Sequence, residues 1–197
     1  MTSERSFCYE YEQKPRQIQV PEEKGEEIKM ADRIEIGVKA GIRDALGEKI
    51  RRRIIEHLDI HVDALQTIEV YTIDAGLTGD AGLTEDELNA AAGGPLSDPV
   101  IQEFSINRPL AGSFDWLIEV GFRPGVTDNV GKTAREALGL LWGRKPAATP
   151  PVYTSRQYRI TGSITRREAE RIASSLLANE LIEHYQIIDG RSWNSTQ

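Results

Sequence analysis

The sequence predicts an α+β fold in which one βαβαβ unit occurs twice along the chain. Three observations predict it: an internal repeat, the same order of β-branched runs and amphipathic helical patterns in both halves, and turn signals between them. The chain has 197 residues, of which 39% are apolar. Because a unit of about 73 residues buries only a modest core by itself, we expect two two-layer sandwich units that pack together as an internal pseudo-dimer.

The repeat is visible in three stretches that keep their order. Residues 36–47 match residues 120–131 at an offset of 84, with three glycines, a basic residue and an aspartate in common. Residues 70–72 match 152–154 at an offset of 82, and residues 96–106 match 177–187 at an offset of 81. The small drift of the offset indicates a duplication followed by two small loop deletions.

Each half begins with a strand, which runs of β-branched and aromatic residues predict at 34–38 and 117–122. A glycine then predicts a turn, and an aspartate stands where a helix N-cap belongs. These residues are Gly41 and Asp44 in the first half, and Gly125 and Asp128 in the second.

The first helix of each half shows apolar residues four apart, as in an amphipathic helix. They are Leu46, Ile50, Ile54 and Leu58 in one half, and Val130, Ala134 and Leu138 in the other. A second strand follows at about 67–73 and 152–160. The second helix starts with a capping box, Thr84 to Glu87 and Thr165 to Glu168, and a last strand is expected at 100–106 and 181–188.

This order divides the chain into five segments. We expect a disordered tail at 1–32, a first repeat at 33–107, a linker at 108–115, a second repeat at 116–189, and a short end without structure at 190–197. Met30 precedes the first strand and is a second candidate start of translation beside Met1.

The stretch 125–133 resembles a phosphate-binding loop, but its spacing is wrong. Such a loop has four residues between its glycines, whereas five separate Gly125 from Gly131. Asp128 stands within the stretch and would repel a phosphate. We therefore expect Gly41 and Gly125 to supply turns, and Gly47 and Gly131 to allow close packing of helix on sheet.

The sequence offers little for catalysis or for a metal. His57 and His61 are four residues apart, as on a metal-binding helix, but we expect His61 to lie beyond the helix end. The single cysteine, Cys8, excludes a disulfide framework and a cysteine-based zinc site. We therefore expect neither a metal site nor a catalytic residue.

The amino-acid composition limits the classes of partner that we expect for this chain. The formal net charge of −7 argues against a nucleic-acid partner, which needs a basic face. No run of about 18 apolar residues and no signal sequence is present, so we expect no membrane association. With a single cysteine, a reducing cytoplasm is the expected location.

Two motifs resemble the PurS family. Residues 122–132, FRPGVTDNVGK, are similar to the family's K-P-G-V-x-D-x-x-G-K between first strand and first helix. Residues 176–187, LLANELIEHYQI, are similar to its terminal L-L-A-N-P-V-I-E-x-Y-x-I, with Glu180 where proline is usual. The first repeat keeps this proline as Pro99. The resemblance covers residues 33–189 and implies a PurS-like fold in each half.

The resemblance also implies a function. PurS is a small non-catalytic component of phosphoribosylformylglycinamidine (FGAM) synthase, a glutamine-dependent ATP ligase of de novo purine biosynthesis. It bridges glutaminase and synthetase and helps ammonia pass between them. We thus expect no cofactor on this chain, with ATP and Mg bound elsewhere in the complex. A fused tandem unit forms the N-terminal domain of long synthases, so the chain is either such a fragment or a free subunit.

Two alternatives belong to other classes of function. One is a paired ligand-sensing regulatory module, because small duplicated α+β units often bind metabolites between their halves. The other is ligase activity of the chain alone, which we expect to be absent. The residues that we expect to shape the interface loops are Gly41, Asp44, Gly47, Gly125, Asp128, Gly131, Asp98, Pro99 and Asn179.

Overall fold

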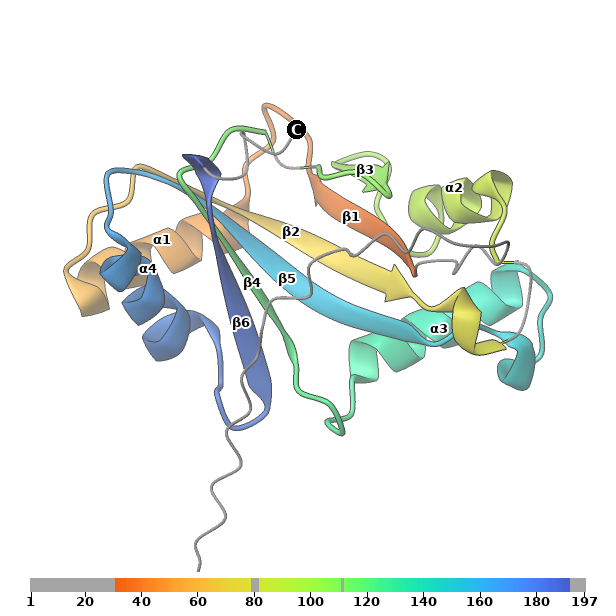
Figure 1. Cartoon of the computed structure of the whole chain (residues 1–197). Coiled ribbons are helices and arrows are strands. Elements are labelled where there is room, and N and C mark those ends of the chain that lie inside the picture. The colour runs from red at the N-terminus through yellow and green to blue at the C-terminus, as the bar shows by residue number, and fades with distance from the viewer. Residues whose placement is uncertain (1–30, 79–81, 111, 192–197) are drawn as a thin grey trace, which may run out of the picture.

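The computed structural model describes residues 31–78, 82–110 and 112–191. Within these residues, six strands form one antiparallel sheet and four α-helices pack against it (Figure 1). The elements follow each other as β1-α1-β2-α2-β3 and then β4-α3-β5-α4-β6. This is the predicted order, and the α+β class is confirmed.

The bounds of the elements are as follows. The first half contains β1 (Asp32–Val38), α1 (Ala45–Leu58), β2 (Ala64–Ile73), α2 (Glu85–Gly93) and β3 (Gln102–Ile106). The second contains β4 (Trp116–Phe122), α3 (Asn129–Leu141), β5 (Val152–Thr161), α4 (Arg166–Ile172) and β6 (Glu183–Asp189). Short 3-10 helices cover Ala75–Thr78 and Pro146–Ala148, and a π-helical turn, Ala173–Leu177, continues α4.

The capping boxes are confirmed, whereas some strand ends differ from expectation. Thr84 and Thr165 both exchange the two predicted hydrogen bonds with the glutamate three residues later. The last strands begin at Gln102 and Glu183, two residues later than expected, because the preceding residues form a tight turn. β2 begins at Ala64, since its ladder with β5 extends that far.

The expected unstructured ends need correction where the structure describes them. Asp32, placed in the tail, is the first residue of β1. Gly190 is buried in a helical turn, and its backbone N–H donates to Asp115 O at 2.9 Å. Residues 1–30 and 192–197, to which the other predictions of disorder apply, lie outside the described residues.

The two halves join in the middle of the sheet. Its strand order is β3-β1-β2-β5-β4-β6, and each neighbouring pair is antiparallel. β2 and β5 pair over their full length, from Ala64 opposite Thr161 to Ile73 opposite Val152. The strand order from one edge to the centre therefore repeats the order from the other edge.

The register corrects the predicted match in the second strand. Thr67 and Thr154 each donate a backbone N–H to the N-cap aspartate of their own half. These two residues are therefore equivalent, at an offset of 87, and the match of 70–72 to 152–154 at 82 is wrong. The physical reason is the connection between α3 and β5, which contains an extra 3-10 helix and is longer than the one between α1 and β2.

The cores combine both halves. Buried side chains of the described residues form two clusters on the helix-bearing face of the sheet. One packs α1 and α4 on the sheet and includes Ile54, Ile172 and Ile118. The other packs α2 and α3 and includes Leu88 and Leu138. Figure 1 shows the same grouping, with α1 beside α4 at one end and α2 beside α3 at the other.

Close packing of the first helix of each half on its strand gives a stability test. A Cβ on Gly47 would lie against the carbonyl oxygen of Leu65, and one on Gly131 against that of Val152. Gly47→Ala and Gly131→Ala should each destabilise the protein by about 1–3 kcal/mol, measured by urea denaturation. Gly93→Ala in α2, where the nearest atom would be a Phe104 ring carbon at 3.6 Å, is the matched control and should not destabilise it. Unchanged stability of both test variants would contradict this packing.

Candidate functional site

The strand-to-helix turns are built alike in both halves. Asp44 accepts the N–H of Gly47 at 2.8 Å with one carboxylate oxygen, and the N–H and hydroxyl of Thr67 at 2.6 and 2.9 Å with the other. Asp128 makes the same contacts with Gly131 and Thr154, at 2.7, 2.6 and 2.8 Å. Each aspartate thus caps a helix and ties it to the neighbouring strand. Since Asp128 already occupies the N-terminus of α3, a phosphate has no place there.

The turns before these caps need glycine. Gly41 and Gly125 have φ of +84° and +88°, in the left-handed region that side chains with a Cβ rarely adopt. Both therefore supply the turn for which the sequence analysis selected them.

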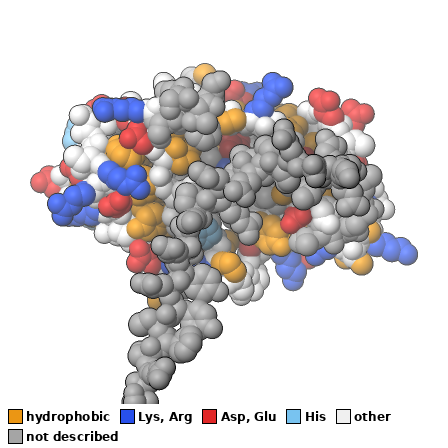
Figure 2. Space-filling model, in the orientation of Figure 1, with side chains coloured by type: hydrophobic (Ala, Val, Ile, Leu, Met, Phe, Trp, Pro, Cys, Tyr) orange, Lys and Arg blue, Asp and Glu red, His pale blue; other side chains and the backbone are white. Residues whose placement is uncertain are grey.

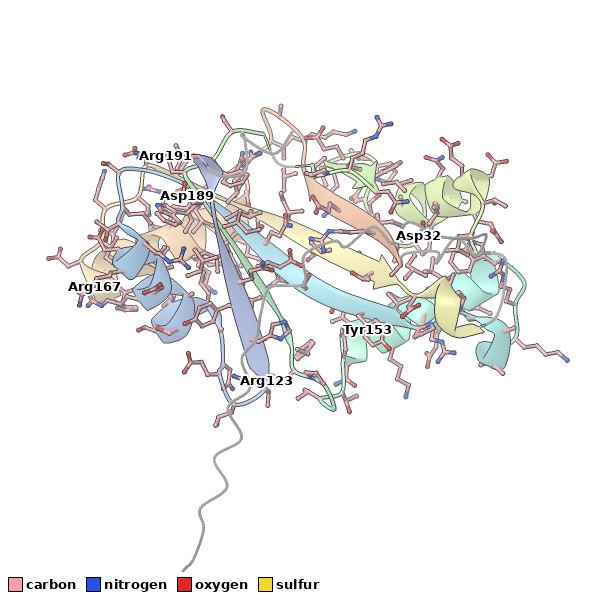
Figure 3. The ribbon with its side chains drawn as sticks, in the orientation of Figure 1. Asp32, Arg123, Tyr153, Arg167, Asp189 and Arg191 are labelled. Carbon is pink, nitrogen blue, oxygen red and sulfur yellow. The ribbon has the colours of Figure 1, made fainter. Side chains whose placement is uncertain are left out.

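The helix-to-strand turns are also equivalent. Asp98 Oδ1 accepts the N–H of Val100 at 2.9 Å, and Asn179 Oδ1 accepts that of Leu181 at 3.2 Å. A basic side chain from the strand-to-helix turn holds each of them. Lys39 Nζ donates to Pro99 O at 2.6 Å, and Arg123 Nε donates to Glu180 O at 3.0 Å; Arg123 is labelled in Figure 3.

These contacts assemble the nine predicted loop residues into one region per half. We call residues 39–47 with 98–101 the first turn region, and residues 123–131 with 179–182 the second. Because β1 and β4 run in opposite directions in the sheet, the two turn regions lie at opposite ends of it.

Both turn regions expose apolar side chains. In the first they are Ile42, Leu46, Val100 and Ile101; in the second they are Val130, Leu181 and Ile182. Val100 is 76% exposed and Leu181 is 87% exposed. Leu46 and Val130 were expected on the core side of their helices, but each lies in the first helical turn, beyond the edge of the buried face.

The helix-free face of the sheet carries a charged cluster that the sequence analysis did not find. Glu35 of β1 and Glu119 of β4 share the guanidinium of Arg33. Its Nε donates to Glu35 at 2.8 Å, and its terminal nitrogens donate to Glu119 at 3.2 and 2.8 Å. The amide of Gln157 donates to both glutamates, at 3.3 and 3.0 Å, and the hydroxyl of Ser155 donates to Glu119. This charged cluster therefore links the two halves.

Electrostatics favour the ionised state of this cluster. Burial disfavours the charge of Glu119, but hydrogen bonds and the positive charge of Arg33, with further bonds from Ser155 and Gln157, outweigh burial and hold the pKa of Glu119 below its ordinary value. Burial also opposes the charge of Arg33, yet Glu119 and Glu35 together raise the pKa of Arg33 above its ordinary value.

The sequence contains a pattern that could have indicated the two glutamates of the charged cluster, but none that indicates Arg33 or Gln157. Glu35 and Glu119 occupy the same repeat position, in IEIG and IEVG, and a charge repeated within an apolar strand could have marked them. Arg33 aligns instead with Leu117, and Gln157 aligns with Val70 at the offset of 87. The repeat therefore gives no hint of either partner.

The described surface is mixed in charge, and two histidines were considered as metal ligands. Figure 2 shows Lys and Arg side chains interspersed with Asp and Glu on the coloured part of one face. In residues 31–78, 82–110 and 112–191, no group of three His, Cys, Asp or Glu side chains is arranged to hold a metal ion. His61 lies beyond the end of α1, with Nε2 3.4 Å from Asp63. In the same part of the chain, no helix is long and apolar enough to cross a membrane.

Comparison with known proteins identifies no relative of this chain. No protein-family model matches the sequence, and a search of curated proteins finds no match either. The resemblance of two motifs to the PurS family therefore stays a prediction from the sequence.

The lowered pKa of Glu119 predicts how stability depends on pH. A carboxylate with a folded pKa below its unfolded value stabilises the protein above the unfolded value, and this stability is lost as pH falls through the folded pKa. Wild-type stability should therefore fall as pH drops below about 4.5. Glu119→Gln should lose about 1–3 kcal/mol at neutral pH and show a shallower fall, measured by urea denaturation across this range. Glu136→Gln, on the exposed side of α3, is the control and should leave this pH dependence unchanged. The prediction is contradicted if Glu119→Gln does not change the slope of the unfolding free energy against pH.

Proposed function

We propose that this chain is a non-catalytic, PurS-like component of FGAM synthase, which bridges the glutaminase and the synthetase for ammonia transfer in the cytoplasm. The observation that carries the proposal is the pair of equivalent, apolar turn regions at opposite ends of the sheet. ATP and Mg then belong to the synthetase, and the chain is either a free tandem subunit or the N-terminal part of a long synthase.

The proposal includes an internal pseudo-dimer of two βαβαβ units. Its support is the register of the central strands. At the offset of 87, Glu69 is the equivalent of Arg156, and these two residues face each other in the β2–β5 ladder. An approximate two-fold axis through this pair would exchange β2 with β5 and each turn region with the other.

A bridge needs two separate contact surfaces, and the turn regions meet this need. Exposed apolar side chains that cluster on a surface often mark contacts with other proteins. The equivalent side chains stay apolar in both halves: Leu46 corresponds to Val130, Val100 to Leu181, and Ile101 to Ile182. One turn region would contact the glutaminase and the other the synthetase.

Co-elution with the two partners tests this role. On a size-exclusion column with glutamine and ADP present, the chain should elute together with a purified glutaminase and synthetase of FGAM synthase. Val100→Glu should lose one partner and Leu181→Glu the other, because each places a charge in an apolar contact. Leu140→Glu, at an equally exposed leucine at the end of α3 (85% exposed), is the matched control and should keep both.

The possible outcomes distinguish the bridging role of the chain from the use of the turn regions as its contact surfaces. No shift in the elution of the wild-type chain would sink the bridging role. Co-elution of the wild type and of both turn-region variants would keep the role but reject the turn regions as its contacts.

One observation favours the alternative of a ligand-sensing module. A cavity of about 570 Å³ beside the charged cluster is lined by residues from both halves. Calorimetric titration of the isolated chain with amino acids and purine nucleotides distinguishes the two functions. Tight binding without co-elution would support sensing, whereas co-elution without such binding supports the bridge.

A further inference from the structure

In the first half of the chain, a segment of the chain itself lies on the helix-free face of the sheet. It is the start of the connection from β3 to β4, and Leu110 makes the closest contacts. The backbone N–H of Leu110 donates to Glu35 Oε2 at 2.8 Å. A Cβ added to Gly37 of β1 would lie 2.8 Å from Leu110 Cδ2. Gly37 therefore makes room for a leucine side chain from a segment that crosses the sheet.

The equivalent of Gly37 in the second half is Gly121 of β4. Each glycine pairs with the second strand of its half on one side and with the last strand on the other. Of the described residues, the atoms nearest to a Cβ on Gly121 would be Ser155 Cβ at 3.4 Å and His184 Cε1 at 3.6 Å. These are ordinary contact distances, so neither neighbour requires a glycine at this position.

A glycine inside a strand lowers stability and commonly marks a tight bend, a bulge, or the close approach of another chain or a ligand. Gly121 is paired on both sides, with β5 and with β6, and its φ is not positive. Neither a turn nor a bulge therefore accounts for it. Its position fits a place where another chain approaches closely, as Leu110 approaches Gly37.

The space over Gly121 is a pocket of about 540 Å³, which lies within the range of ligand pockets. Residues 124–126 of the turn before α3 form one side of it, and Tyr153, His184 and Gln186 line it from β5 and β6; Tyr153 is labelled in Figure 3. These three side chains are exposed. Their polar atoms can form hydrogen bonds with the backbone of a bound segment, and the Tyr153 ring adds apolar surface.

We propose that this pocket binds a peptide segment of another protein, with an aliphatic side chain the size of leucine seated on Gly121. The contacts of Leu110 show this mode of binding on the equivalent surface of the same sheet. The hydrogen bond to the glutamate is not repeated, because each carboxylate oxygen of Glu119 already accepts two hydrogen bonds. Burial of the aliphatic side chain therefore provides most of the affinity.

The pocket borders the second turn region, but the proposal does not depend on the bridging function. Binding of a peptide is measured without a glutaminase or a synthetase, and co-elution with these partners is measured without a peptide. Each proposal can therefore fail without the other.

Titration of the full chain with a peptide of residues 106–113, followed by backbone amide NMR, tests the proposal. The peptide has the sequence of the segment that contacts the equivalent surface. The shifts should saturate at a single site around Gly121 and its neighbours in β5 and β6. The same peptide with Leu110→Asp should bind at least about tenfold more weakly, because a charge replaces the buried side chain. No binding, equal affinity of the two peptides, or shifts confined to other strands would overturn the proposal.

Gly121→Val locates the site and shows whether the pocket is empty in the free protein. Its side chain fills the space on Gly121, so peptide binding should weaken at least about tenfold. The melting temperature should stay near that of the wild type, since the nearest described atoms leave room for a Cβ. Gly37→Val is the matched variant and should lower the melting temperature, because Leu110 lies there. An equal fall of both melting temperatures would mean that the chain itself or a second copy occupies the pocket, and it would overturn the proposal.

A second variant tests the lining without changing a glycine. Tyr153→Ala removes a side chain that is 51% exposed, so the protein should stay folded while peptide binding weakens. Leu140→Ala, at an exposed leucine of α3 outside the pocket, is the control and should bind the peptide as the wild type does. Undiminished binding by both Gly121→Val and Tyr153→Ala would reject this pocket as the site.

Discussion

The pairing of β2 with β5 is the interaction on which the rest of the structure depends. Without it, each strand would be an exposed sheet edge, which invites pairing with other chains. With it, ten residues of each strand are paired, α1 comes to lie with α4, and α2 with α3. The same pairing brings Glu35 and Glu119 onto one face within reach of a single arginine. Both cores and the charged cluster therefore follow from one ladder.

A single chain with two similar halves can place different residues at equivalent positions, which two identical subunits cannot do. Glu69 and Arg156 illustrate this at the centre of the ladder, where their side chains form an ion pair at 3.4 Å. Both are more than 40% exposed, so the pair adds little stability, but it avoids the like charges that identical subunits would bring together. Arg33 and Gln157 likewise differ from the residues at the equivalent positions, Leu117 and Val70. The result is one asymmetric charged cluster in place of two copies.

Local features of the fold could be predicted from the sequence, and non-local ones could not. The capping boxes at Thr84 and Thr165 depend on residues three apart, and the N-caps Asp44 and Asp128 depend on a similarly short stretch. The strand order and the offset of 87 depend on pairing between strands far apart in the chain. In β2, Ile68, Val70 and Tyr71 are all buried, because both faces of this central strand are covered. Apolar and polar residues therefore do not alternate along β2, so its sequence does not indicate which face packs against the helices. For the same reason it does not indicate the charged cluster on the opposite face.

The central claim is that the β2–β5 ladder makes one cooperative body of the two repeats. Native-state hydrogen exchange of the backbone amides in these two strands, followed with increasing denaturant, tests it most directly. The amides of Ile68 and Val70 should open with the same free energy and the same denaturant dependence as those of Gln157 and Tyr158, both equal to global unfolding. Opening of β5 at a clearly lower free energy, while β2 stays protected, would contradict it and make the halves independent units.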